Sequence, residues 1–96
     1  MLLHILNRSP ATSDAYRQAL TAMGPEDRLL LIEDGVQGAM TALVEHFAEA
    51  AGRLYVLHDD LEARGLMPYL DAAVEVVDMA GFVTLTEQAD QTLSWF

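Results

Sequence analysis

The pattern of apolar and polar positions is clearest over residues 28–36. Residues 29–32 form an unbroken apolar run, Leu-Leu-Leu-Ile, which ends in Glu33, Asp34 and Gly35. A short apolar run without alternation is typical of a strand buried on both faces in a parallel sheet. We therefore predict that residues 29–32 form the centre of a sheet, with the carboxylates and Gly35 at its carboxyl end.

Four other segments are predicted to be strands. They share a short length and apolar, β-branched or aromatic residues, and they cover residues 2–6, 53–58, 74–78 and 92–96. Apolar residues at helical spacing predict helices over residues 13–23 and 36–50, and a short helix over 61–64. A turn and a short helix are expected over 80–86. Residues 66–73 are compatible with a loop or with a short helix that starts near Pro68.

Polar residues and glycines mark the expected ends of these helices. Thr12 or Ser13 is expected to cap the first helix, Asp34 the second, and Asp59 with Asp60 the third. Glycines are expected to end the second and third helices, at Gly52 and Gly65. Strands that alternate with helices predict one α/β domain over residues 1–96. The predicted fold is a small three-layer α/β/α domain with a mostly parallel sheet of about five strands.

Composition narrows the classes of partner. The formal net charge is −10, with 15 acidic residues against 5 arginines, which opposes direct binding to nucleic acid or to anionic membranes. Hydrophobic residues make up 52% of a chain too short to bury them all, so we expect an oligomer. The chain shows no basic signal segment and no apolar run of about 20 residues, which favours a cytoplasmic location.

The sequence contains no cysteine and no lysine. Disulfides, thiolate metal sites, a thiol nucleophile and Schiff-base chemistry are therefore excluded within this chain. It also has no glycine-rich phosphate loop and no pair of histidines at metal-binding spacing. From the residues we predict no catalytic group, no metal and no cofactor.

A few polar residues still need an interpretation. Glu33 and Asp34 are adjacent at a strand end, so their side chains should point to opposite sides rather than act as a pair. His58 is the best candidate among the three histidines for a functional group, although a structural imidazole is the simpler reading. Ser9 is expected to be a loop or cap hydroxyl, since no acid, base or glycine-flanked elbow accompanies it. Trp95, near the end of the chain, should pack on the core or against a partner.

Several segments together resemble the DsrH/TusB family of sulfur-relay proteins. Residues 3–10 read LHILNRSP and resemble the family's "LHxxxxSP" opening, and residues 30–36, LLIEDGV, resemble its "LLxEDGV" or "LLxQDGV" segment. Residues 55–65 resemble the "YxLxxDLxARG" block, and residues 77–86 resemble "DYxGFVxLT", with Met79 where an aromatic residue is common. Trp95 also fits. The match spans nearly the whole chain.

The resemblance implies a DsrE/F/H-like fold and a subunit of a heterohexamer with two copies of each of three related chains. In the TusBCD form, the partners are TusC- and TusD-like (DsrF- and DsrE-like) subunits. The complex takes persulfide sulfur from a TusA-like carrier and passes it to a TusE-like carrier, toward thiolation of the wobble uridine of tRNA. The reactive cysteine belongs to the TusD-like chain. In the DsrEFH form, the related complex serves sulfur oxidation.

Some family members carry a cysteine in the first helix, where this chain has about Ala19. Since sulfur transfer needs a thiolate, the resemblance implies a non-catalytic accessory subunit and favours the TusB form. Its signature residues, expected at an interface or in a structural role, are Asp34, Gly35, His58, Asp60, Arg64, Gly65, Phe82 and Trp95. The alternatives are a DsrH-like subunit in sulfur oxidation, a stand-alone small enzyme or ligand-binding domain using residues 33–35 and His58, and a homo-oligomer.

Overall fold

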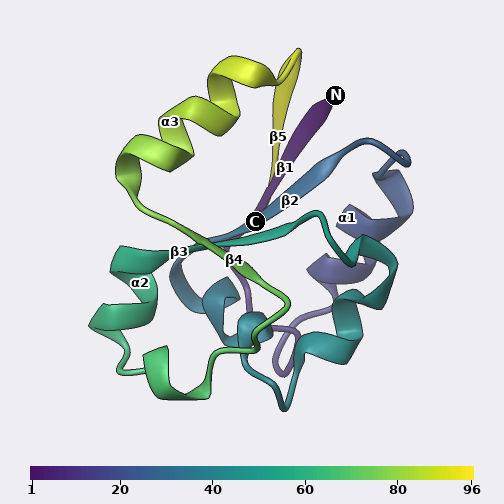
Figure 1. Cartoon of the computed structure of the whole chain (residues 1–96). Coiled ribbons are helices and arrows are strands. Elements are labelled where there is room, and N and C mark those ends of the chain that lie inside the picture. The colour runs from purple at the N-terminus through teal and green to yellow at the C-terminus, as the bar shows by residue number, and fades with distance from the viewer.

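A five-stranded parallel sheet forms the centre of the computed structural model, which describes residues 1–96 (Figure 1). The strands run in the spatial order β4-β3-β2-β1-β5, and every neighbouring pair is parallel. Their bounds are β1 Leu2–Leu6, β2 Arg28–Leu31, β3 Leu54–Leu57, β4 Glu75–Val77 and β5 Gln91–Trp95. This arrangement confirms the predicted α/β class and the five strands, and the sheet is wholly parallel.

Helical segments connect the strands (Figure 1). They are α1 Ala15–Ala22, the 3-10 segments η1 Glu33–Ala39 and η2 Val44–Ala50, α2 His58–Ala63, the short 3-10 turn η3 Met67–Tyr69, and α3 Met79–Gln88. α3 joins β4 to β5, which lie at opposite edges of the sheet, so it must cross the whole sheet. A turn and a short helix were predicted over residues 80–86, but α3 is longer and has 10 residues.

The prediction of one helix over residues 36–50 was wrong. The backbone there forms two 3-10 segments separated by an extended stretch around Met40. An antiparallel bridge pairs Met40 with Leu70. The N–H of Thr41 donates to the carbonyl of Tyr69, and the N–H of Asp71 donates to the carbonyl of Ala39. These long-range hydrogen bonds use the backbone groups that an α-helix would need, so the helix is interrupted.

The two faces of the sheet carry separate cores. One face has 14 buried residues, among them Leu29, Leu31 and Val56, packed beneath α1, η1, η2 and α2. The other face has a cluster of Leu3, Ile5, Leu30 and Leu85. Leu85 comes from α3, so the second face rests on a single helix. The three layers are therefore unequal, and α3 itself leaves Met79 and Val83 about half exposed.

Several expected helix caps were wrong in detail. η1 begins after Ile32, and no side chain caps it, so Asp34 is not a cap. Asp59 and Asp60 lie in the first turn of α2, which begins earlier than predicted, at His58. The N-cap of α1 is Asp14, not Thr12 or Ser13, and no side chain caps the helix, although Ser13 accepts a hydrogen bond from the N–H of Ala15. The two predicted helix-ending glycines, at positions 52 and 65, adopt φ values of +80° and +65°, which L-residues avoid.

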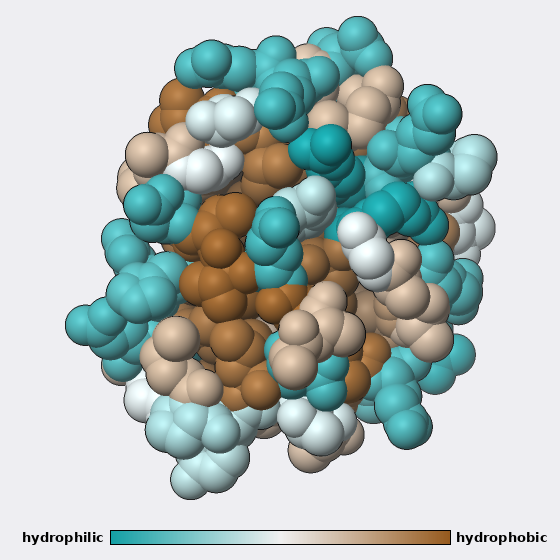
Figure 2. Space-filling view, in the orientation of Figure 1, coloured by the Kyte–Doolittle hydropathy of each residue, from teal (hydrophilic) through white to brown (hydrophobic).

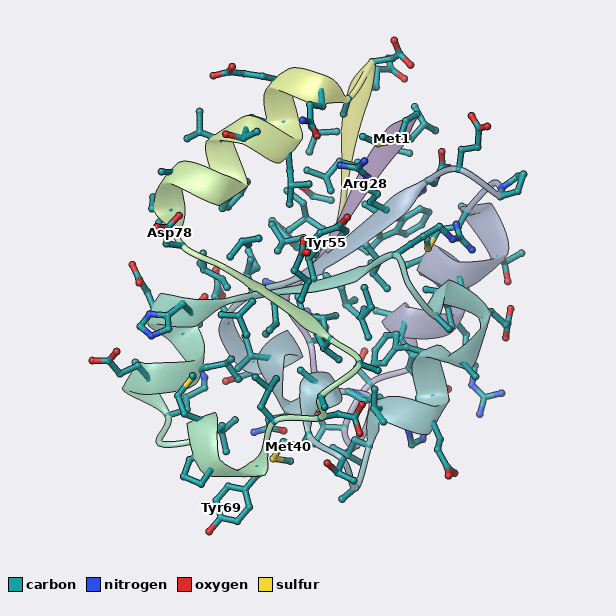
Figure 3. All side chains as sticks on the ribbon, viewed as in Figure 1. Met1, Arg28, Met40, Tyr55, Tyr69 and Asp78 are labelled. Atoms are coloured by element: carbon teal, nitrogen blue, oxygen red, sulfur yellow. The ribbon has the colours of Figure 1, made fainter.

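Apolar side chains reach the surface in several places. Figure 2 shows a continuous apolar area around the position of β4 in Figure 1. The half-buried residues in this part of the fold are Leu66, Leu70, Val76 and Val77. Tyr69, which is 62% exposed, projects from the edge of the molecule near Met40 (Figure 3). No helix is long and apolar enough to cross a membrane.

Candidate functional site

A buried network of His4, Asp27 and Trp95 links β1, the start of β2 and β5. His4 is fully buried in the middle of β1. Its Nε2 lies 3.1 Å from the Oδ2 of Asp27, and its Nδ1 accepts a hydrogen bond of 3.1 Å from the indole N–H of Trp95. The indole also stacks beside the imidazole, at 6.1 Å between ring centroids. The network therefore ties the last strand to the centre of the sheet.

The network fixes the tautomer of the imidazole. An indole N–H can only donate, so the Nδ1 of His4 must be the unprotonated nitrogen of the neutral ring. The proton then lies on Nε2, which donates to Asp27. Asp27 also accepts hydrogen bonds from the backbone N–H groups of Leu2 and Gly24, both at 2.9 Å. The polar groups of His4, Asp27 and Trp95 therefore all form hydrogen bonds within the fold.

This network makes folding stability depend on acid pH. Burial raises the pKa of Asp27, but the hydrogen bonds from Gly24, Leu2 and His4 outweigh it and lower that pKa to about 2. The carboxylate therefore stabilises the fold fully above its unfolded pKa near 4, and that stabilisation is lost as the pH falls through about 2. We expect wild-type protein to lose about 2 kcal/mol between pH 4 and 2 from this group, and D27N to lack that component. Urea unfolding curves at each pH measure both.

The carboxyl ends of β2 and β3 carry a second polar cluster. Arg64, at the end of α2, places its Nε 3.1 Å from the Oδ1 of Asp34 in η1. Asp60 accepts a hydrogen bond of 2.6 Å from the backbone N–H of Glu33. These contacts join η1 to α2 across the loops that leave two adjacent strands. Glu33 and Asp34 were expected at a strand end, but both lie in the first turn of η1.

Backbone geometry is tight at the same edge of the sheet. Glu33 is the one non-glycine residue with positive φ, at 48°, a conformation that costs roughly 1 kcal/mol or more. The Asp60 carboxylate accepts a hydrogen bond from the N–H of Glu33 and so helps to hold this conformation. Gly35 follows two residues later, and a Cβ there would lie 2.4 Å from the carbonyl oxygen of Leu6. Gly35 is thus required for η1 to approach the end of β1.

The remaining signature residues lie apart from this cluster. His58 is the first residue of α2, not the end of a strand, and its side chain is 39% exposed. Its ring nitrogens lie 3.5 Å from Asp59 and 3.4 Å from Glu62. Phe82 is half-buried in α3 against the second core cluster. Gly65 follows α2. The structure brings together Asp34, Asp60 and Arg64, and leaves His58, Phe82 and Trp95 at separate places.

The surroundings offer no arrangement for covalent chemistry. Ser9 is buried, and its Oγ accepts a hydrogen bond from the N–H of Ala11, as expected for a loop hydroxyl. Ala19 lies on the buried face of α1. No group of three His, Asp or Glu side chains could hold a metal ion.

Sequence reasoning missed the network around His4. The one available signal was a histidine inside an otherwise apolar strand, LLHIL, because a fully buried imidazole needs hydrogen-bond partners. Those partners, Asp27 and Trp95, are 23 and 91 residues away along the chain. Only the sheet order, which places β1 between β2 and β5, brings them together.

Comparison with known proteins supports one family. A model described as "DsrH like protein" matches residues 8–92. Protein TusB of Serratia proteamaculans is 40% identical over 98% of this chain and 100% of its own length, and Protein TusB of Escherichia coli is 33% identical over the same shares. The solved ychN protein from E. coli has a TM-score of 0.74 and covers 97% of both chains. At 19% identity, this last likeness shows the fold alone.

These matches confirm the resemblance to sulfur-relay proteins that the sequence motifs indicated. They run nearly from end to end of the chain. The chain belongs to the DsrH family.

Proposed function

We propose that this chain is a non-catalytic, accessory subunit of a cytoplasmic sulfur-relay complex. The complex would contain TusC- and TusD-like chains, two copies of each subunit, and pass persulfide sulfur between TusA- and TusE-like carriers toward thiolation of the tRNA wobble uridine. The proposal rests on one observation: the chain belongs to the DsrH family and contains no cysteine. A persulfide relay needs a thiolate that can attack, hold sulfur and leave, so that group must lie on another chain.

The surface supports a role in assembly. A shallow groove between η1 and η3 is lined mainly by apolar side chains, including Met40, Leu66 and Tyr69. On α3, Met79 and Val83 are each about half exposed and lie one helical turn apart, on one side of the helix. An isolated soluble domain gains nothing from such exposure, whereas a subunit can cover it with a partner.

Native mass spectrometry tests this proposal directly. The chain is expressed with the TusC- and TusD-like chains of its own organism and purified through a tag on a partner. We expect one particle that contains two copies of each of three chains. The same chain expressed alone is the control for self-association. Recovery of this chain only as a monomer or a homo-oligomer, with both partners present, would overturn the proposal.

The ion pair between Asp34 and Arg64 gives a prediction that separates fold from assembly. The Asp34 side chain is largely solvent-exposed and that of Arg64 is 31% exposed, so Arg64→Ala should change the free energy of unfolding by only about 1 kcal/mol or less. If the signature residues form an interface, the same variant should weaken assembly at least tenfold. Arg17→Ala, which removes an exposed pairing with Asp14, is the matched control. Chemical denaturation and titration with the purified partners measure the two effects, and unchanged assembly would remove this pair from the interface.

A further inference from the structure

We propose that the outer edge of β5 receives an extended segment of a partner chain, which adds to the sheet as a sixth strand. This inference rests on the proposed function for the presence of a partner. It goes further by naming the surface and the mode of contact, which is backbone hydrogen bonding to an open sheet edge.

The hydrogen-bonding pattern shows which groups are available. The N–H of Ile32 donates to the carbonyl of Leu6, so the backbone groups of Leu6, and by alternation those of His4, face β2. The groups of Leu3 and Ile5 then face β5, and the register of the pair makes Gln91, Leu93 and Trp95 their partners. The N–H and C=O groups of Thr92 and Ser94 therefore point away from the sheet. No strand lies on that side.

The two edges of the sheet differ in how open they are. β4 at the other edge has only three residues and begins with the charged Glu75. β5 has five residues with no charge, no proline and no glycine, and the first four are exposed. Natural sheets protect their edges with charges, prolines, bulges or short strands. β5 uses none of these, which is the pattern of an edge that is covered in an assembly.

β5 is also held rigidly enough to act as a template. All five of its residues are in register with β1. The hydrogen bond from Trp95 to the buried His4 fixes the carboxyl end of the strand. A strand that is already extended loses little conformational freedom when another segment pairs with it. The edge is therefore preformed.

Charge decides between a second copy and a different partner. Each copy of this chain carries a formal charge of −10, so pairing β5 with another β5 would bring two strongly acidic molecules together. The uncharged β5 favours a segment that is neutral or basic. On one face of the sheet that segment would lie beside Leu93 and Trp95, and on the other beside Thr92 and Ser94. The occupant is therefore a neutral or basic extended segment of a partner chain, apolar at alternate positions.

Hydrogen exchange at single amides tests this inference in the co-expressed complex. We expect the amides of Thr92 and Ser94 to exchange at least tenfold more slowly in the complex than in the free chain. The amides of Gln91, Leu93 and Trp95 already face β1 and should change little. The alternation itself is the signature of strand addition, because burial under a side-chain surface would slow all five.

A pair of variants gives an independent readout. Thr92→Pro removes an outward N–H and is tolerated on an edge strand, so the free chain should remain folded while partner binding weakens at least tenfold. Thr92→Ala keeps the N–H and should bind nearly as wild type. A complex in which the outward amides of Thr92 and Ser94 exchange as fast as in the free chain would overturn this inference alone. Failure to form any complex would overturn the proposed function as well.

Discussion

Replacing Gly35 with alanine should destabilise the fold by about 3 kcal/mol or more. The added Cβ would lie 2.4 Å from the carbonyl oxygen of Leu6 and 3.1 Å from its carbonyl carbon. Leu6 belongs to β1, which lies between β2 and β5, and its oxygen already accepts a hydrogen bond from the N–H of Ile32. The backbone of Leu6 cannot move without disturbing the sheet, so the added methyl group must push η1 away from β1.

Gly24→Ala is the matched control for this effect. A Cβ at Gly24 meets nothing closer than 3.7 Å, and the backbone N–H that donates to Asp27 is retained. Urea denaturation followed by the fluorescence of the single tryptophan, Trp95, gives both free energies of unfolding. If G35A and G24A have the same stability, the close approach of η1 to β1 is not present in solution.

Asp27→Ala should destabilise the fold by about 2–4 kcal/mol, because three donors lose their acceptor. These are the backbone N–H groups of Leu2 and Gly24 and the Nε2 of the fully buried His4. With that partner gone, the imidazole is no longer oriented to accept from Trp95. We therefore expect a change in tryptophan fluorescence in the folded state, in addition to the lower stability.

Asp27→Asn serves as the conservative comparison. Its amide oxygen can still accept one or two of the three hydrogen bonds, so its stability should lie between those of wild type and D27A. Denaturation at neutral pH ranks the three proteins. A D27A protein as stable as D27N would show that the buried hydrogen bonds contribute little.

The sheet could be predicted because its strands are apolar runs with clear boundaries. Residues 29–32 were predicted as a strand from their unbroken apolar run, and the structure places Leu29, Leu30 and Leu31 fully buried in β2. α3 was harder, because Val83, Thr84 and Thr86 disfavour helices. In the structure the two threonine hydroxyls donate to backbone carbonyls within the helix, and Asp78 caps its start by accepting from Gly81.

The polar contacts could not be predicted because they depend on tertiary placement. The helix expected over residues 36–50 is interrupted by a bridge from Met40 to Leu70, a residue from a distant loop. Asp34 was expected to cap that helix, but it pairs with Arg64. Local patterns indicate which residues prefer a cap or a turn. They do not show which distant partner competes for the same group.

The central claim is that this chain assists sulfur transfer without carrying sulfur. The most direct test incubates the purified complex with a persulfide donor and measures the intact mass of every chain, with and without this subunit. We predict added sulfur on a cysteine of a partner and none on this chain, together with slower onward transfer when this chain is omitted. Transfer that proceeds at the same rate in its absence would contradict the claim.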